Sequence, residues 1–120
     1  MADIEQLKRF ADTLPGIRHD VKWRSVDVYS IHLTKMVCIF YDTDKMACKV
    51  DDDLFITLSQ LPGCRPESHL ARAKWVEFGP ECPLPQAELE KLLSRSWQLV
   101  KDKLPKAVQA LYTMPKHDLE

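Results

Sequence analysis

The chain of 120 residues is long enough for one domain with a hydrophobic core and too short for two domains of ordinary size. Apolar residues make up 45% of the sequence and charged residues 29%, which is typical of a soluble globular protein. The formal net charge of −1 excludes a strong overall basic field that would attract nucleic acid.

The first element is predicted to be an amphipathic helix of about three turns. Asp3 can cap its start, with Gln6 three residues later, and Pro15-Gly16 ends it. Apolar residues recur at helical spacing between these signals. They are Ile4, Leu7, Phe10, Ala11 and Leu14.

The next segment, residues 17–25, is polar and is expected to be irregular, with Trp23 as a lid over the edge of the core. Residues 26–33 alternate in the manner of a strand, and residues 36–41 form a continuous apolar run typical of a central strand. Residues 46–50 predict a third strand. Short strands joined by tight turns indicate an antiparallel meander.

The C-terminal half begins with Asp51-Asp52-Asp53, which predicts the capped start of a second helix that ends at Pro62-Gly63. Residues 75–78 predict a fourth strand, and Pro85 suits the first turn of a long helix reaching Leu104. A short helix is expected over residues 106–112. The whole pattern predicts an α+β domain whose N-terminal and C-terminal helices pack on an antiparallel four-stranded sheet.

The boundaries and compartment follow from the ends of the chain and its cysteines. We expect a single domain over residues 1–118, because Leu119-Glu120 resembles an expression-vector remnant. The N-terminus has no signal-peptide pattern, and no apolar run is long enough to span a membrane. Four cysteines lack Cys-x-x-Cys spacing, which predicts reduced thiols and a cytoplasmic location. They are Cys38, Cys48, Cys64 and Cys82.

One stretch concentrates chemically distinctive residues. Residues 65–75 hold three basic side chains, a histidine and a tryptophan within eleven positions. Residues 65–106 carry eight Lys or Arg against six Asp or Glu, a small local excess of positive charge. This stretch is the first place to expect contact with a partner.

Several motifs together resemble those of the MmcQ/YjbR family. They are Leu14-Pro15-Gly16 after the opening helix, the lone Trp23, the meander, the strand-to-helix step over residues 49–55, Arg65-Pro66-x-Ser68-His69-Leu70 leading to Trp75, Leu84-Pro85, Ser96-Trp97-x-x-Val100 and Lys103-Leu104-Pro105-Lys106. The resemblance covers residues 5 to 106 or so and implies a CyaY-like, double-wing α+β fold in a bacterial-type protein. It also implies the family's label of DNA-binding protein, which rests largely on fold similarity. Lys74 stands where these proteins often have histidine, so a role that needs two histidines is in doubt.

The nucleic-acid hypothesis has a defined set of residues. Cationic side chains would contact phosphates, and an exposed tryptophan could stack on an unpaired base. The phosphate candidates are Arg65, His69, Arg72, Lys74, Arg18, Lys22 and Arg24, and the stacking candidates are Trp23 and Trp75.

A structural role competes with this hypothesis at the same positions. Arg65 would then pair with an acidic residue, His69 would hydrogen-bond the loop backbone, and Trp75 would be buried. The alternative function is a protein- or small-ligand-binding module with no nucleic-acid role. In either case we expect a monomer.

Metal binding and catalysis have weaker support. The three aspartates at residues 51–53 are better explained as a helix cap, and zinc-ligand spacing is absent from the sequence. A two-residue loop after the central strand would place Cys38 and Cys48 on opposite faces, whereas a three-residue loop would bring them together. Ser68-His69 are neighbours in sequence, but no catalytic motif surrounds them. We therefore expect no enzymatic activity, no cofactor and no metal.

Overall fold

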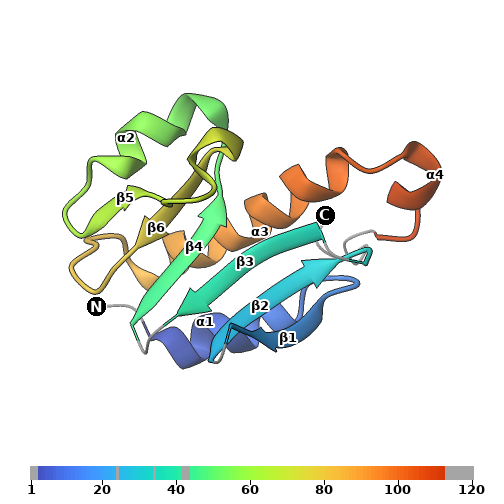
Figure 1. The fold of residues 1–120 in the computed structure, drawn as a ribbon, viewed down its shortest axis with the longest axis horizontal. Helices are drawn as coiled ribbons and strands as arrows, with labels where there is room; N and C mark the ends of the chain where they lie inside the picture. Colours follow the sequence, from blue (N-terminus) through green and yellow to red (C-terminus); the bar gives the residue numbers. More distant parts are fainter. Residues whose placement is uncertain (1–2, 24, 34, 42–43, 113–120) are drawn as a thin grey trace.

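The computed structural model describes residues 3–23, 25–33, 35–41 and 44–112. They form an α+β arrangement, as the sequence predicts (Figure 1). In chain order the helices and strands are α1 (Ile4–Asp12), β1 (Arg18–Lys22), β2 (Val26–Ile31), β3 (Lys35–Tyr41), β4 (Lys45–Lys49), the 3-10 helix η1 (Asp52–Leu54), α2 (Phe55–Ser59), β5 (Cys64–Pro66), the 3-10 helix η2 (Ala71–Ala73), β6 (Trp75–Phe78), α3 (Gln86–Asp102) and α4 (Lys106–Gln109).

The sheet is antiparallel and has six strands, in the order β1-β2-β3-β4-β6-β5. The predicted number of four strands is therefore wrong, because both edge strands were missed. Strand β1 lies in the segment expected to be irregular and is largely exposed, so it lacks an apolar alternation. Strand β5 has three residues and contains Pro66, which an edge strand tolerates because one side of its backbone needs no partner.

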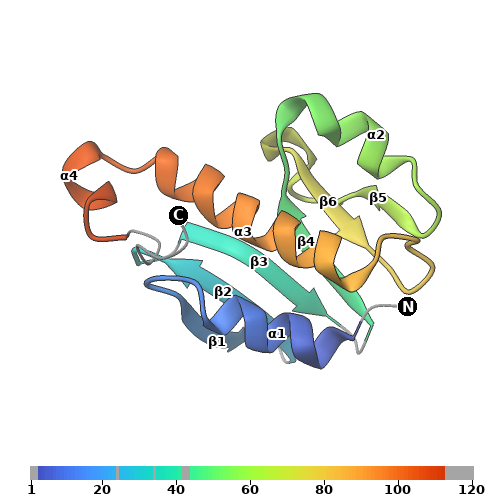
Figure 2. The same cartoon turned by 180° about the vertical axis from the view of Figure 1, so that it is seen from behind.

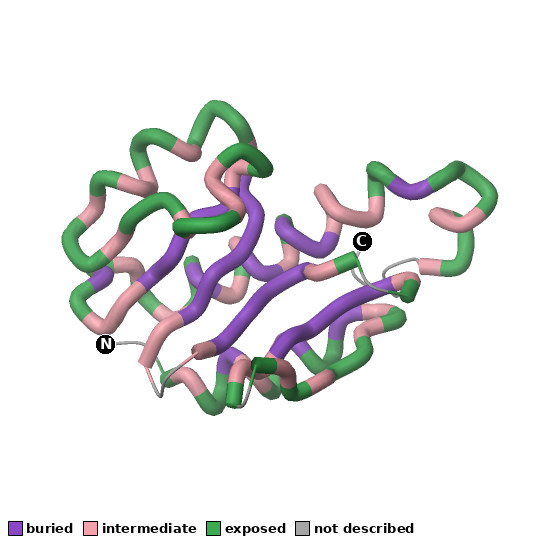
Figure 3. The backbone as a smooth tube through the Cα atoms, viewed as in Figure 1, coloured by how far each residue is buried: buried purple, intermediate pink, exposed green. Residues whose placement is uncertain are grey.

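Helices α1 and α3 cover one face of the sheet (Figure 2). The main core lies between these helices and the sheet, and Figure 3 shows the residues of the central strands as mostly buried. Its largest sheet residues are Tyr29, Phe40, Met46 and Phe78. In the described part of the chain, the opposite face carries no long helix. It holds a small cluster of Ile39, Ala47 and Trp75, against which Leu70, just before η2, packs.

The register of β3 and β4 decides the cysteine question that the sequence left open. Cys38 lies directly opposite Cys48, and both thiols are buried on the helix-covered face. Three residues separate the end of β3 from the start of β4, so the two-residue alternative is wrong. The extra residue shifts the pairing by one position and returns both thiols to the same side.

Helix α1 begins where it was predicted. The side chain of Asp3 accepts a hydrogen bond from the Gln6 amide at 3.1 Å, which confirms the cap. After the helix, Gly16 adopts a φ of +72°, and a Cβ atom there would overlap the ring of Tyr112. Glycine is required at this turn for both reasons.

The expected aspartate cap of the second helix is wrong. No side chain caps η1 or α2. The Asp51 carboxylate instead accepts two hydrogen bonds from Arg95 of α3, at 2.9 Å from Nε and 2.8 Å from Nη2. This pair lowers the pKa of Asp51, and it ties the connection after β4 to the long helix.

A buried serine joins α3 to the sheet where β3 and β4 separate. Val37 is the extra residue of a β-bulge in β3, and the regular pairing with β4 stops at Cys38 and Cys48. The next pair in that register would be Val37 and Lys49. The Ser96 hydroxyl lies between them instead, donating to the Val37 carbonyl at 2.6 Å and accepting from the Lys49 amide at 3.1 Å.

We predict that Ser96→Ala lowers the free energy of unfolding by about 1–3 kcal/mol, because it leaves a buried amide and a buried carbonyl unpaired. Urea denaturation followed by far-ultraviolet circular dichroism measures this change. The matched control is Ser94→Ala on the same helix, since the Ser94 side chain has no hydrogen bond among the described residues. Equal stability of the two variants would contradict the bridging role.

Candidate functional site

Five cationic side chains gather at the end of the sheet where β3 begins and β4 ends. The two strands diverge there, with the C-terminal half of α3 behind them (Figure 1). A recess of about 420 Å³ occupies this place. Five of its lining residues are cationic and one is acidic. We call it the basic recess, and it is lined by Lys35, Lys49, Arg72, Lys74, Lys103, Asp52, Ala73, Trp75, Val100 and Leu104.

Contacts within the fold fix the positions of two of these lysines, Lys49 and Lys74. Lys49 is the last residue of β4, and its Nζ donates to the Ala73 carbonyl at 2.5 Å. Lys74 ends η2 in the left-handed conformation with a φ of +63°, and its Nζ lies 5.1 Å from the centre of the Phe55 ring. The Val50 amide donates to the Lys74 carbonyl at 2.9 Å, so the two lysines belong to one hydrogen-bonded unit.

The positive charge in the basic recess is poorly neutralised. Burial lowers the pKa of Lys49, and the charges of Lys103 and Lys74 lower it further, whereas the Asp52 carboxylate acts in the opposite direction. Among the described residues, no carboxylate lies within 4 Å of the amino or guanidinium nitrogens of the four other cations. The arrangement therefore favours an anion that supplies the missing negative charge.

The recess unites two predicted cations and the stacking candidate Trp75 with three cations that sequence reasoning missed. Arg72 and Lys74 were singled out from the stretch of residues 65–75. Lys35, Lys49 and Lys103 were not, because they come from two strands and a helix far apart in the sequence. No local motif connects them. Lys49 and Lys103 open two of the segments that resemble the family, but no local signal marks their charges and that of Lys35 as neighbours.

Arg65 lies outside the recess and has a carboxylate partner, as the structural alternative anticipated. Its Nε and Nη2 donate to Glu77 at 3.1 and 3.3 Å, and the Tyr41 hydroxyl donates to the same carboxylate at 2.8 Å. Glu77 is buried, and these contacts compensate its charge. Burial and the contact with Glu77 raise the pKa of Tyr41 well above its usual range.

The predicted cations of the N-terminal connector, residues 17–25, do not line the recess either. Arg18 and Lys22 belong to β1, the edge strand at the opposite side of the sheet from β5. Arg24 is outside the described residues. The structure therefore does not bring the cations of β1 into the basic recess.

A second hollow lies on the face of the sheet without long helices. It has a volume of about 600 Å³. We call it the apolar groove, and it is lined by Trp23, Val26, Met36, Ile39, Tyr41, Glu67, His69 and Leu70.

The two tryptophan candidates differ in exposure. Trp23 is 66% exposed and follows β1 with a φ of +44°, so its predicted role as a lid on the core edge is wrong. Trp75 is only 4% exposed and packs against Ile39 and Ala47, as the structural alternative anticipated. His69 is exposed, and its Nδ1 contacts the Ser68 hydroxyl at 3.0 Å, not the backbone. Ser68 and His69 do contact each other, but the described residues add no orienting group to the pair.

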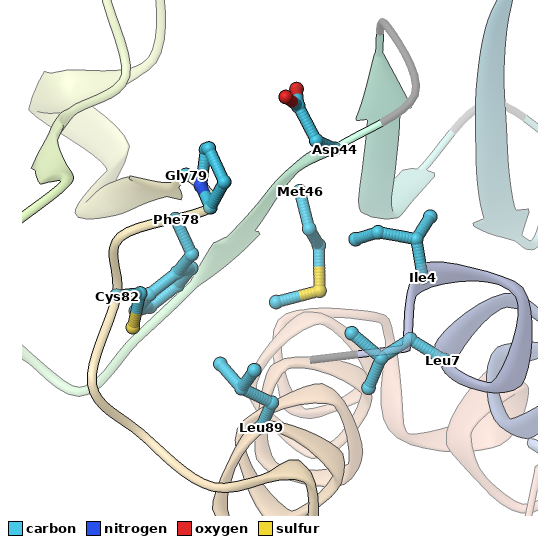
Figure 4. A pocket seen from close by; sticks show the side chains of 9 residues that line it. Ile4, Leu7, Asp44, Met46, Phe78, Gly79, Cys82 and Leu89 are labelled. Atoms are coloured by element: carbon cyan, nitrogen blue, oxygen red, sulfur yellow. The ribbon is translucent and has the colours of Figure 1, made fainter. Parts of the chain in front are cut away.

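The cavity between the helices and the sheet and the two paired cysteines offer little to a ligand. The cavity in Figure 4, between α1, α3 and the sheet, measures about 10 Å³, which is room for about one water molecule. Burial raises the pKa of Cys48 to about 12 and holds that of Cys38 well above its usual value, so neither is a ready nucleophile. No three His, Cys, Asp or Glu side chains gather as metal ligands in this part of the chain. No described helix is long and apolar enough to cross a membrane.

We predict that Tyr41→Phe lowers the free energy of unfolding by roughly 1–3 kcal/mol, because a buried carboxylate loses a hydrogen bond. Chemical denaturation measures the change. Tyr29→Phe is the matched control, since the Tyr29 hydroxyl has no hydrogen-bond partner among the described residues and its removal should change stability little. If the two substitutions had the same small effect, the contact of Tyr41 with Glu77 would carry no net stabilisation.

Comparison with known proteins places the chain in a family. A family model described as YjbR matches residues 12–99. A crystal structure of a Deinococcus radiodurans protein with a domain described as DUF419 is similar at a TM-score of 0.80 and 25% sequence identity, covering 96% of this chain and 91% of that one. A Pseudomonas syringae protein shares the fold at a TM-score of 0.65 and 19% identity, covering 82% of this chain and 98% of that one. None of the curated proteins matches in sequence. Because the family model spans well over half of its length, the chain belongs to the YjbR family.

Proposed function

We propose that this protein is a non-enzymatic nucleic-acid-binding protein whose phosphate contacts lie in the basic recess. The observation that carries the proposal is the meeting, among the described residues, of five cationic side chains with a single carboxylate in one hollow. Phosphate groups are the anions that such a surface would neutralise, with release of counterions from the nucleic acid. The DNA-binding label implied by the family motifs agrees with this assignment.

The distribution of charge supports a local site. The whole chain carries a formal net charge of −1, so its overall field does not attract a polyanion. Binding must then rest on the recess, and its affinity should be modest and strongly dependent on salt. Contacts to phosphates carry no sequence information directly, so the proposal does not include a preferred sequence.

The proposal extends to the protein's surroundings. We propose further that the protein is a monomer in the bacterial cytoplasm and that its fold is of the CyaY-like, double-wing type. The alternative function is a protein- or small-ligand-binding module, and the observation in its favour is the apolar groove with its exposed Trp23. Dependence of binding on the recess cations separates the two functions.

We predict that the paired substitution Arg72→Gln and Lys103→Gln flattens the salt dependence of nucleic-acid binding. If each residue contacts one phosphate, the slope of log K against log salt should fall in magnitude by roughly 1.4–1.8. Fluorescence anisotropy with labelled single-stranded and duplex DNA, at several salt concentrations, measures the slope. Both side chains are exposed and have no ion-pair partner in the described part of the chain, so the fold should be unaffected.

The control variant carries Arg18→Gln and Lys22→Gln, which remove the same charge from β1 outside the recess. It should keep the wild-type slope. A flattened slope in the β1 variant combined with an unchanged slope in the recess variant would move the site to the N-terminal connector. Absence of binding to either form of DNA at low salt would overturn the proposed function.

We also predict that a phosphate anion in the recess raises the pKa of Lys49. In the free protein that pKa is lowered below its ordinary 10.5. Protonated Lys49 therefore lowers the free energy of unfolding at neutral pH. The protein regains this free energy as the pH rises from the pKa of the folded state to the ordinary value of 10.5 in the unfolded state. A bound anion stabilises the protonated form and shrinks this gain. Lysine-selective nuclear magnetic resonance with inorganic phosphate measures the shift, and sodium chloride of equal ionic strength is the control. An equal shift with chloride would contradict anion binding beside Lys49.

A further inference from the structure

The apolar groove and the basic recess share a wall. The buried ring of Trp75 lines the recess, and its cluster is packed against Met36, Tyr41 and Leu70, which line the groove. The backbone links the two sides as well, because the amide of Trp75 donates to the Leu70 carbonyl at 3.2 Å. Lys35 and Met36 are consecutive in β3, and each lines one of the two hollows. The two hollows are therefore neighbours in the fold.

The groove offers a large apolar surface for a flat ring. Trp23 is the exposed tryptophan of the described residues, and a hydrogen bond from the Ser25 amide to the Trp23 carbonyl at 3.2 Å holds its turn. Tyr41 and Met36 add aromatic and polarisable surface to the same hollow. A volume of about 600 Å³ is within the range of small-molecule sites.

The rim of the groove has polar atoms with hydrogen-bonding capacity left over. Glu67 uses Oε1 to accept the amides of His69 at 2.6 Å and Leu70 at 3.1 Å. The Ser68 hydroxyl is within hydrogen-bond distance of His69 Nδ1, at 3.0 Å. Within the described residues, Glu67 Oε2 and His69 Nε2 have no hydrogen-bond partner, so both can meet the polar edge of a base.

We propose that the apolar groove holds an unpaired base of a single strand whose phosphates lie in the basic recess. This inference rests on the proposed function, because the recess supplies the charge that brings the strand to the groove. A base within a duplex is stacked on both faces and hydrogen-bonded to its partner, so it cannot enter without being unpaired. Stacking is tolerant of sequence, since every base has an aromatic face. The protein therefore selects single strands over duplex.

The test compares a labelled oligothymidylate with an abasic strand of the same length, whose phosphates are identical. Wild-type protein should bind the oligothymidylate roughly 5- to 150-fold more tightly at the same salt concentration, the range expected for one stacked base. Trp23→Ala should remove most of this preference and leave the salt slope unchanged. Binding should also protect Trp23 from quenching by acrylamide, a neutral quencher, because the two other tryptophans are buried.

The matched control is Leu33→Ala. Leu33 is 73% exposed and has a φ of +63°, so it resembles Trp23 in exposure and backbone conformation, but it does not line the groove. This variant should keep the preference for the strand with bases. A loss equal to that in Trp23→Ala would overturn the assignment to the groove.

Three further outcomes would also overturn the inference. Equal affinity of the wild-type protein for both strands would exclude the groove as a base site and leave the recess as a phosphate site. Protection of Trp23 that grows with protein concentration in the absence of nucleic acid would assign the groove to a second copy of the chain. If neither strand binds at low salt, the proposed function fails, and the base site fails with it.

Discussion

The hydroxyl of Ser96 determines how the sheet opens towards the candidate site. It stands between the Val37 carbonyl and the Lys49 amide, where the antiparallel ladder would otherwise continue. A direct pair at that position would hold the start of β3 against the end of β4. By satisfying both backbone groups from α3, the serine lets the strands diverge without leaving a buried polar atom unpaired. The basic recess lies in the resulting space.

The cationic residues of the stretch 65–75 are of two kinds, which differ in whether a carboxylate neutralises them. Arg65 neutralises the buried carboxylate of Glu77, so its charge is already compensated within the fold. Arg72 and Lys74 have no carboxylate within ion-pair distance in the described part of the chain, and they lie beside the buried Lys49. Like charges held close together repel one another. The proposed anion in the recess would relieve that repulsion, which is the physical basis of the proposal.

Elements with a strong local signal could be predicted, and elements that depend on pairing partners could not. The long helix shows apolar periodicity because one side of it is buried, and the central strand β3 shows a continuous apolar run because both of its faces are buried. Strands β1 and β5 lie at the two edges of the sheet, where exposure removes that periodicity. The shared face of Cys38 and Cys48 depended on the exact length of one turn, because a shift of one residue reverses every side chain in a strand.

By itself, the sequence determined the α+β class, the cap at Asp3 and the motifs of the YjbR family, all of which are encoded in short or regularly spaced segments. The tertiary structure alone decided that Trp23 faces solvent over an apolar groove. It also decided that Lys35, Lys49 and Lys103 meet in one recess. The physical reason is that charge density depends on distances in space. Residues far apart in the chain acquire those distances only when strand pairing and helix packing bring them together.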